Sequence, residues 1–447
     1  MVITLIVIAL VSMLVGIPFA YSLLLGVTLS TAIFEPSSLS NLPLLAMSDI
    51  NDPLIIAIPM LIIAGEMLSA VGAIEPIVDT WQRVFGKVRG SLGVCCVGTS
   101  LFFAGSTGSS AAESAAVASA FQVPMEARGY SRSYVASLVV ASTAIGILLP
   151  PSIAMILYAQ VINYSVTQLW IAGIYPALLA AALIALVSMF RARRMQRTAL
   201  ATGPPAAETM SVTAGTAESE PAESEPAAAE ASATHGVRKV VASVTGVLIP
   251  VLVVGGIYSG ILTLSEVAAA LVAVVVLYGL LITRIGGRRL FKAARVGAER
   301  AGAVFLIVIA ARLFSNVLVE QQTIVGLLNT VSNLHLSKFL TLLLANIAML
   351  AAGTLMDGLS LIIIGAPILY SLLTPFGISP VHLAIIMAMN LEIGVMHPPL
   401  GGNLFAVSSV TGVRVGRIAR DVLPYLAVLL IMLLLVTYVP VPGFAWN

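Results

Sequence analysis

Two short stretches of this chain, each with a Pro-Pro pair, carry the strongest structural signal in the sequence. Residues 146–152 read Gly-Ile-Leu-Leu-Pro-Pro-Ser, and residues 394–400 read Gly-Val-Met-His-Pro-Pro-Leu. Their offset is 398 − 150 = 248, and it aligns residues 101–155 with residues 349–403 without a gap, at ten identities. Because both stretches lie in long apolar sequence, the pattern predicts a duplicated unit that interrupts a helix inside the membrane in each copy.

The composition around these stretches indicates a membrane protein. The chain is 59% hydrophobic and 9% charged, whereas a soluble domain carries about 25% charged residues. A membrane-spanning helix needs about 20 apolar residues, and residues 169–190 and 422–439 supply such runs without a charge. The sequence therefore predicts an all-α integral membrane protein. A net charge of +2, without interleaved basic and aromatic residues, gives no sign of a nucleic-acid partner. The neighbours Cys95 and Cys96 predict packing and no transition-metal site.

The basic residues predict the topology. Twenty of the 22 lysines and arginines fall in clusters, which we place on the cytoplasmic side by the positive-inside rule. The clusters lie at residues 83–89, 128–132, 191–197, 238–239, 284–300 and 414–420. Arg312 and Lys338 are the remaining two.

When the chain is followed across the membrane with these clusters on the cytoplasmic side, two inverted-topology repeats are predicted. The first repeat, residues 1–190, contains a re-entrant hairpin at about 91–123 and a broken helix at 133–164. The second, residues 243–447, contains a hairpin at about 338–373, entered from the opposite side, and a broken helix at 381–412. This arrangement is typical of secondary transporters. Residues 34–52 are predicted to lie outside, 284–299 to form an amphipathic arm at the inner surface, and 301–318 to form a separate span.

The connecting segment, residues 191–242, is predicted to be a cytoplasmic linker. Its part 198–236 is rich in Ala, Glu, Ser, Thr and Pro and has no aromatic residue. Such a composition buries too little apolar surface to order itself, so we predict disorder there. A simple tether is favoured over a regulatory role.

The interruptions are the candidate sites, because backbone groups freed at membrane depth need partners that lipid does not offer. A hard cation such as sodium accepts oxygen ligands of this kind. One predicted sodium site groups Ser106, Thr107, Gly108, Ser109 and Ser110 with Pro150, Pro151 and Ser152. The other groups Gly353, Thr354, Asp357 and Gly358 with Gly394, His397, Pro398, Pro399 and Asn403. An anionic substrate is predicted between the two sites, at Ser109, Ser110, Ser152 and Asn403.

Each polar residue also has a structural interpretation. Any single serine can bond only to its own helix backbone. Asp357 is the strongest candidate, since a carboxylate at membrane depth is costly and usually functional. For Glu66, Glu392 and Arg312, ion pairs or hydrogen bonds within the scaffold are favoured over substrate contact. Glu113 fits a helix-terminus stabiliser as well as a ligand, and a structural hydrogen bond is favoured for His397.

The same motifs resemble a known family. The residues Gly105-Ser-Thr-Gly-Ser-Ser-Ala-Ala-Glu113, Gly146-Ile-Leu-Leu-Pro-Pro-Ser152, Asp357 in its hairpin, and Pro398-Pro-Leu-Gly-Gly-Asn-Leu-Phe405 look like the large membrane subunit of tripartite ATP-independent periplasmic (TRAP) transporters. The resemblance covers nearly the whole chain except 198–236. The chain departs from the family pattern at four residues, namely Glu113, Gly358, His397 and Gly402, which puts the details of ion coordination in question.

The resemblance implies a sodium-driven importer of an organic acid, such as a C4-dicarboxylate, that works by an elevator motion in the inner membrane. It also implies two partners, a small four-helix membrane subunit and a periplasmic substrate-binding protein. No enzymatic cofactor is implied. Two alternatives stay open at this stage. One is a stand-alone, ion-coupled carboxylate transporter without a binding protein. The other is a membrane-embedded hydrolase, which is disfavoured because no Gly-x-Ser-x-Gly elbow occurs.

Overall fold

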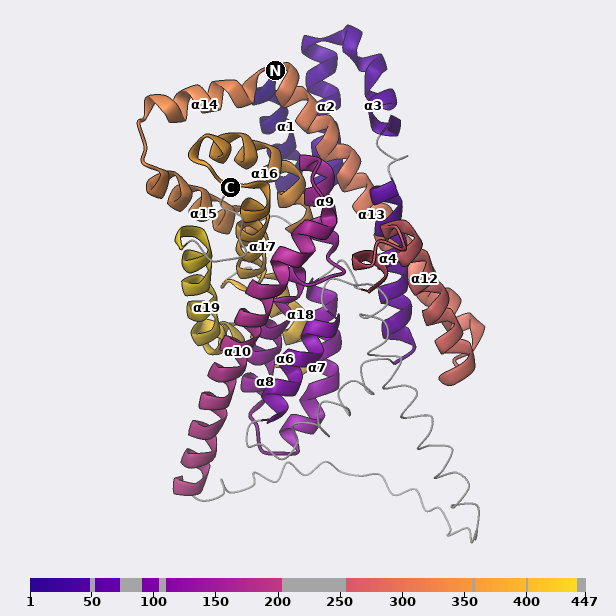
Figure 1. The fold of residues 1–447 in the computed structure, drawn as a ribbon, viewed down its shortest axis with the longest axis vertical. Helices are drawn as coiled ribbons and strands as arrows, with labels where there is room; N and C mark the ends of the chain where they lie inside the picture. The colour runs from indigo at the N-terminus through magenta and orange to yellow at the C-terminus, as the bar shows by residue number, and fades with distance from the viewer. Residues whose placement is uncertain are drawn as a thin grey trace.

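The computed structural model describes residues 1–48, 53–72, 91–103, 110–202, 255–355, 358–398 and 401–439, and within these ranges the chain is helical, with no strand (Figure 1). The α-helices before residue 203 are α1 Val2–Leu14, α2 Phe19–Phe34, α3 Leu42–Ser48, α4 Pro53–Ala70, α6 Ser91–Phe103, α7 Ser110–Glu126, α8 Arg132–Thr143, α9 Ile153–Ile162 and α10 Val166–Thr202. Those after residue 254 are α12 Leu264–Leu277, α13 Gly287–Glu320, α14 Thr323–Asn333, α15 Lys338–Leu355, α16 Gly358–Leu373, α17 Pro380–Met396, α18 Gly402–Thr411 and α19 Val415–Tyr438.

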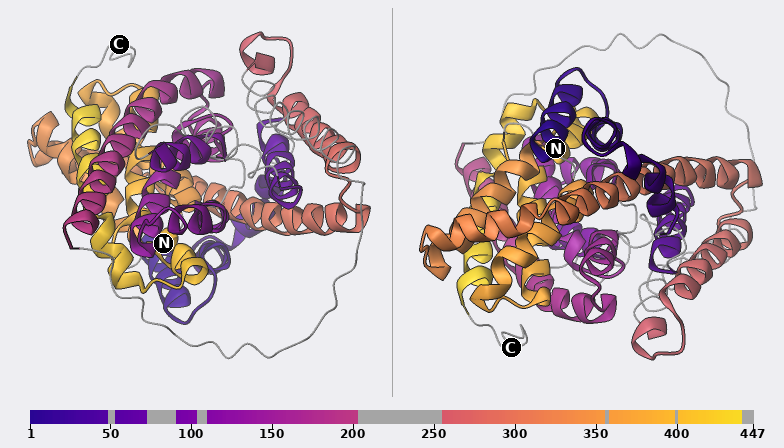
Figure 2. Two further views of the ribbon diagram at one scale, coloured as in Figure 1. Left: turned by 90° about the horizontal axis from the view of Figure 1, so that it is seen from below. Right: turned by 90° about the horizontal axis from the view of Figure 1, so that it is seen from above.

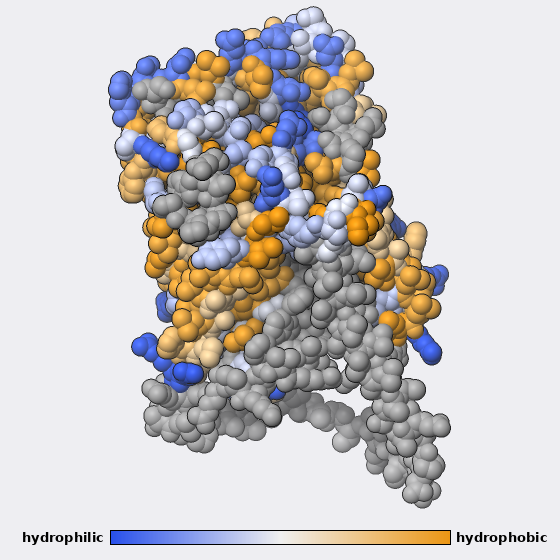
Figure 3. Space-filling view, in the orientation of Figure 1, coloured by the Kyte–Doolittle hydropathy of each residue, from blue (hydrophilic) through white to orange (hydrophobic). Residues whose placement is uncertain are grey.

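Six segments of the described chain are long and apolar enough to cross a membrane. They are Arg132–Ile162, Val166–Arg194, Leu264–Ile282, Gly287–Glu320, Gly358–Phe376 and Val415–Tyr438. Many large apolar side chains on the outer helices face outward, among them Leu14, Phe190 and Ile431. Figure 3 shows this apolar surface along the flanks, with hydrophilic residues gathered at the top of the view. An apolar exterior of this kind suits lipid, so the chain is a multi-pass membrane protein.

The interrupted helices lie at the centre of the molecule. Every residue of α8 from Ser133 to Thr143 is buried, and α17 is buried over nearly its whole length. α8 ends at Thr143 and α9 begins only at Ile153, while α17 ends at Met396 and α18 begins at Gly402. The described residues of both interruptions are buried or half-buried, as irregular backbone at membrane depth must be.

Helix boundaries correspond between the halves under the offset found in the sequence. Four helices have a counterpart: α6 and α15, α7 and α16, α8 and α17, α9 and α18. Adding 248 to the first residues of α7 and α8 gives 110 + 248 = 358 and 132 + 248 = 380, which are the first residues of α16 and α17.

The same local chemistry starts both broken helices. Ser131 caps α8 by accepting from the Tyr134 backbone nitrogen at 3.3 Å, and Ser379 caps α17 by accepting from the His382 nitrogen at 3.2 Å. A serine before the first helical residue satisfies one of the unpaired N–H groups of a helix start. Two residues earlier, Gly129 and Gly377 have φ of +83° and +72°, a conformation that favours glycine.

The two broken helices run in opposite directions. Ser133, at the start of α8, donates to Asp421 Oδ2 at 2.5 Å, and Asp421 lies beyond the end of α18. Tyr158, in α9, donates to the backbone oxygen of Pro380, the first residue of α17, at 2.7 Å. The start of α8 therefore lies near the chain that follows α18, and α9 lies near the start of α17, as expected for two antiparallel broken helices.

A second group of helices stands beside this centre. α13 packs against α2, α4 and α16, and α4 packs against α12 (Figure 1). Arg300 of α13 forms an ion pair with Glu66 of α4, the scaffold role that the sequence favoured for Glu66. A separate apolar cluster joins α1 and α2 to the outer part of α13 through Leu5, Val27 and Phe314. Figure 2 shows α13 extending from the bundle out toward α4 and α12 in both views.

Two sequence predictions need correction in this region. The predicted arm 284–299, from Gly287 onward, and the predicted span 301–318 form one continuous helix, α13, because nothing in the basic segment breaks a helix. Residues 198–202, predicted to be disordered, continue α10, since Ala and Leu favour helix. Residues 34–48, part of the segment predicted to lie outside, contain a 3-10 helix, Pro36–Asn41, and helix α3. Residues 203–254, the rest of the predicted linker included, lie outside the described residues.

Candidate functional site

A polar junction joins the first hairpin to the second broken helix. Ser110, the first residue of α7, donates from Oγ to Glu392 Oε2 of α17 at 3.2 Å. Its Oγ also accepts from Asn403 Nδ2 of α18 at 2.8 Å. Asn403 and Glu392 are buried, with 1% and 6% of their surface exposed. The helices α7 and α18 pack closely along their lengths, which brings side chains nearly 300 residues apart in sequence into direct contact.

Two buried polar atoms near this junction lack a partner within the described part of the chain. They are Asn403 Oδ1 and His397 Nδ1. An unpaired buried acceptor is costly, by about 1–3 kcal/mol, so such atoms require an explanation. A hydrogen-bonded amide whose oxygen stays open is suited to a cation, because oxygen is the donor that hard cations prefer.

The start of α7 is also fixed to its own half. Ser114 Oγ lies 2.6 Å from Thr143 Oγ1, the last residue of α8, so the hairpin helix is joined to the first interruption. Glu113 is in the first turn of α7 and is 3% exposed. A carboxylate in the first turn of a helix interacts favourably with the helix dipole, which agrees with the structural interpretation of Glu113.

Ser152 and Pro150 lie in the first interruption, and Ser152 has a clear structural task. Its side chain is fully buried and caps α9 by accepting from the Met155 backbone nitrogen at 3.3 Å. The interruption is held against α10 at Gly173, where a Cβ would lie 2.2 Å from Leu148 O. The sequence grouped Ser110 with Ser152, whereas the structure places Ser110 against residues of the second half.

The second interruption depends on a close glycine pair. A Cβ on Gly394 would lie 3.0 Å from Gly353 Cα, so α15 and α17 approach backbone to backbone at this point. Gly401 completes the turn, since a Cβ there would lie 2.5 Å from Val395 O. His397 ends α17, and its backbone oxygen accepts from the Gly401 nitrogen at 3.0 Å. Pro398 follows directly.

Several predicted ligands lie outside the described residues. These are Ser106, Thr107, Gly108 and Ser109 at the first tip, Asp357 at the second tip, and Pro399 in the second interruption. Thr354 lies in the last turn of α15, with a side chain that is not described. Gly358 is the first residue of α16, where a Cβ would meet only ordinary contacts of 3.9 Å or more with Leu391.

The sequence interpretation missed a pair of asparagines. Asn390 of α17 donates from Nδ2 to Asn346 Oδ1 of α15 at 2.6 Å, and Asn346 Nδ2 donates to Thr437 of α19 at 3.3 Å. Both asparagines are buried, and Asn390 Oδ1 has no partner among the described residues. The available signal was an amide inside an otherwise apolar helix, which lipid would not tolerate unpaired.

Corresponding positions of the two halves make corresponding bonds. Tyr134 donates to Ser188 O at 2.9 Å, and His382 Nε2 lies 2.7 Å from Val436 O. The offsets are 382 − 134 = 248 and 436 − 188 = 248. Ser142, the counterpart of Asn390, accepts from Ser100 of α6 at 3.0 Å. The interrupted helices are thus fixed to their neighbours at matched places by different side chains.

The centre brings buried polar groups of both halves together. It offers amide, hydroxyl and carboxylate oxygens, and within the described ranges no three His, Cys, Asp or Glu side chains group as a metal site. Interrupted helices and buried polar groups inside a helical membrane protein are typical of membrane transport proteins, and this chain falls in that class.

Comparison with known proteins identifies the family. The chain belongs to the family described as "Tripartite ATP-independent periplasmic transporter, DctM component", whose model matches residues 6–441. The resemblance found in the sequence is therefore confirmed, and the chain is a TRAP transporter large permease.

Named relatives act on different solutes. The C4-dicarboxylate TRAP transporter large permease protein DctM of Pseudomonas aeruginosa is 34% identical over 95% of this chain and 93% of its own length. The sialic acid TRAP transporter large permease protein SiaM of Vibrio cholerae is 28% identical over 95% and 93%. The isethionate TRAP transporter permease protein DctMQ of Oleidesulfovibrio alaskensis is 30% identical over 96% of this chain and 64% of its own length. These relatives are permeases and not enzymes.

A solved structure supports the fold. The crystal structure of the YdaH transporter of Alcanivorax borkumensis superposes with a TM-score of 0.59, at 16% sequence identity, over 89% of this chain and 86% of that chain.

Proposed function

We propose that this permease imports an organic acid together with sodium, by an elevator motion of two inverted repeats. The supports are the matched helix boundaries, the opposite directions of the two broken helices and the equivalent bonds made by Tyr134 and His382. A duplicated unit with inverted topology is the common plan of secondary transporters. In this proposal α6 to α9 and α15 to α18 move as one body against α2, α4, α12 and α13.

The junction of Ser110, Asn403 and Glu392 carries the proposal. It joins a hairpin of one repeat to a broken helix of the other, and it leaves Asn403 Oδ1 buried and open among the described residues. We assign that oxygen to a sodium ion, as cargo and not as a resident cofactor. The substrate carboxylate lies near the start of α7, where the positive end of the helix favours an anion.

The remaining predicted ligands complete the two sodium sites of the proposal. Asp357 supplies a charged oxygen to the second site, and Ser106 to Ser109 supply hydroxyl and backbone oxygens to the first. Pro150, Ser152, Gly353, Thr354, Gly358, Gly394, His397 and Pro398 contribute backbone or hydroxyl oxygens near the interruptions.

The substrate arrives through two partner proteins in this proposal. A periplasmic binding protein delivers the organic acid, and a small four-helix subunit accompanies the permease in the inner membrane. The support is the family's tripartite description and the relative of which this chain spans 64%. The residues between α10 and α12 connect the repeats on the cytoplasmic side.

Reconstitution tests this function. The purified permease with its small subunit is placed in liposomes, and uptake of labelled succinate, N-acetylneuraminate or isethionate is followed with an inward sodium gradient and the cognate binding protein. We expect uptake of at least one acid only when sodium and the binding protein are both present. Uptake without the binding protein would favour a stand-alone transporter, and uptake without sodium would refute the coupling.

The variant Asp357→Ala tests the second sodium site in the same assay. We expect it to need about tenfold more sodium for half-maximal uptake, because one charge-assisted contact of about 1.5–3 kcal/mol is lost. The comparison is Glu320→Ala, a carboxylate at the exposed end of α13. An unchanged sodium dependence in Asp357→Ala would remove Asp357 from the site.

A further inference from the structure

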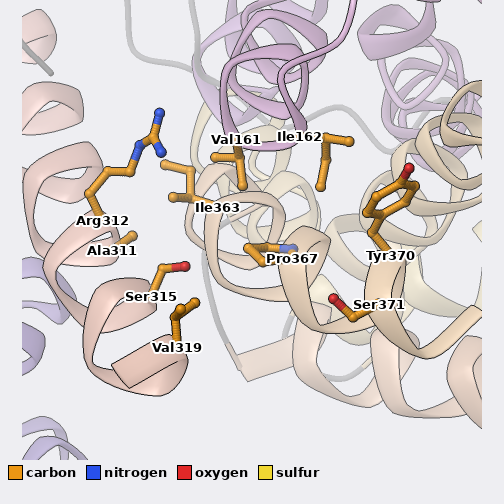
Figure 4. A pocket seen from close by; sticks show the side chains of 10 residues that line it. All are labelled: Val161, Ile162, Ala311, Arg312, Ser315, Val319, Ile363, Pro367, Tyr370 and Ser371. Atoms are coloured by element: carbon orange, nitrogen blue, oxygen red, sulfur yellow. The ribbon is translucent and has the colours of Figure 1, made fainter. Parts of the chain in front are cut away.

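A cavity lies apart from the polar junction, where α9 and α16 meet α13. Its volume is about 240 Å³, which is room for several water molecules or a small organic anion. The walls come from α9 at Val161 and Ile162, from α13 at Arg312, Ser315 and Val319, and from α16 at Tyr370 and Ser371, with Ala311, Ile363 and Pro367 between them (Figure 4).

The polar groups of this cavity are donors. Arg312 contributes a guanidinium, and Ser315, Tyr370 and Ser371 contribute hydroxyls, whereas none of the ten lining residues carries a carboxylate. Figure 4 shows the hydroxyls of Ser315 and Ser371 directed from opposite walls toward the space between them. The Arg312 guanidinium extends toward Gln160 of α9 and away from the Ser315 hydroxyl (Figure 4), so the cavity has a cation at one end and hydroxyls at the other. Both kinds of donor match a carboxylate, which accepts hydrogen bonds through both of its oxygens.

The position of Arg312 is set by the ends of two helices. Its Nη2 donates to Gln160 O, near the C-terminal end of α9, at 3.3 Å. Arg312 lies 320 − 312 = 8 residues before the last residue of α13, or about 12 Å from that helix end at about 1.5 Å per residue. A charged side chain at such depth usually faces the protein interior or a water-filled cavity and pairs with a polar or charged group there.

We propose that this cavity is an outer subsite that binds the carboxylate of the organic anion before it reaches the polar junction. The inference rests on the proposed import of an organic acid and adds a second binding place to it. α9 and α16 belong to the proposed moving body and α13 to the scaffold, so the cavity lies at the seam where the two bodies slide. A phospholipid phosphate shares this anionic chemistry and is the competing occupant.

A cysteine at the cavity wall tests the charge of the site without any transport. Val319 lines the cavity, is 61% exposed and offers no polar group, so Val319→Cys introduces a reactive thiol and leaves every donor intact. Cys95 and Cys96 are fully buried, and the parent chain measures their background. Leu334→Cys, exposed near the end of α14, controls for the intrinsic rates of the reagents.

The measurement compares an anionic with a cationic methanethiosulfonate reagent on the full chain in phosphatidylcholine nanodiscs. We expect the anionic reagent to be favoured at Val319→Cys relative to Leu334→Cys. Adding Arg312→Gln should lower this preference about fourfold. The thiol lies 319 − 312 = 7 residues, or about 10 Å, along α13 from Arg312, where a unit charge in water changes the energies of the two reagents by about 0.4 kcal/mol each, in opposite directions. Arg312→Lys, which keeps the charge, should retain it. The same preference with and without Arg312→Gln would overturn the proposal.

Competition then identifies the occupant. Millimolar succinate should slow labelling of Val319→Cys and lose this effect in the Arg312→Gln background, while choline at equal concentration should not. Protection by phosphatidylglycerol in the nanodisc, without protection by succinate, would assign the cavity to lipid and overturn the proposal. Labelling needs neither sodium nor a binding protein. A failed uptake assay beside Arg312-dependent protection by succinate would therefore count against the proposed function and not against this subsite.

Discussion

The broken helix of the first half and that of the second half share a backbone plan but not their polar side chains. In the first half, Ser142 and Tyr134 join α8 to its neighbours through hydroxyl groups. At the matched positions of the second half, Asn390 and His382 use an amide and an imidazole. The difference teaches that the two halves share helix starts and interruptions, whereas the polar side chains that hold their broken helices differ.

The largest effect is expected at the glycine pair of the second half. In Gly394→Ala, the new Cβ would lie 3.0 Å from the backbone of Gly353, which has no flexible side chain to move aside. We expect a loss of about 1–3 kcal/mol of stability and most of the uptake. Thermal unfolding by fluorescence and sodium-driven uptake are the measurements.

Two further glycine variants serve as controls for Gly394→Ala. Gly416→Ala places its Cβ in open space and should behave as the parent. Gly146 is the matched position in the first half. An equal loss of stability in Gly146→Ala would show that both halves need a close approach at this position, and a small loss would confine that need to the second half. A fully stable and active Gly394→Ala would contradict the close approach itself.

The next effect is expected at Asn403, where the halves differ most in chemistry. Asn403→Leu removes the amide that donates to Ser110 and the open oxygen assigned to sodium. Losing one such contact, worth about 1.4 kcal/mol, should raise the sodium concentration for half-maximal uptake about tenfold. The matched position is 403 − 248 = 155, and Met155→Leu should keep the parent sodium dependence. Equal shifts in both variants would remove Asn403 from the ion site.

A smaller effect is expected for the asparagine pair. Asn390→Ala leaves Asn346 Oδ1 without its donor, and interhelical bonds of this kind in membranes are worth about 0.6–1.7 kcal/mol. The thermal unfolding midpoint should therefore fall by a few degrees. Ser142→Ala, at the matched position, should cost less because Cys96 and Ser100 lose only hydroxyl contacts. A greater fall of the unfolding midpoint in Ser142→Ala than in Asn390→Ala would contradict this prediction.

The smallest effect is expected at the equivalent pair Tyr134 and His382. His382→Tyr places the side chain of the first copy at the matched position of the second, so it should retain a donor toward Val436 O. His382→Phe cannot donate, and we expect it to be less stable than His382→Tyr by about 1 kcal/mol. Unfolding of both variants in the same detergent measures the difference. Equal stabilities would show that the bond to Val436 is dispensable.

Local signals in the sequence were sufficient for the interruptions. Proline at Pro150 and Pro398 excludes regular helix, and serine at Ser131 and Ser379 satisfies a helix start. These effects act within a few residues, so they can be read along the chain. The matched helix starts at Ser110 and Gly358 are a further example, since each follows a short polar tip.

Contacts between the halves could not be read in the same way. Ser110 reaches Asn403 across 293 residues because α7 packs on α18, and no local pattern states which helices become neighbours. Asn390 was missed because one amide in an apolar run has no period. The basic first part of α13 was predicted as a separate arm because its arginines suggested a surface boundary. Long basic side chains can, however, extend to water from a continuous helix.

The order of side chains along α13 has a consequence for energetics. One stripe of this helix reads Ala301, Phe305 and Val308 toward the basic end, then Arg312, Ser315 and Val319 toward the other end. Arg312 is the only charged residue between Arg300 and Glu320, and it lies 312 − 300 = 12 residues, or about 18 Å of helix, from Arg300. The uncharged stretch between the two arginines therefore offers an anion no ionic partner from α13.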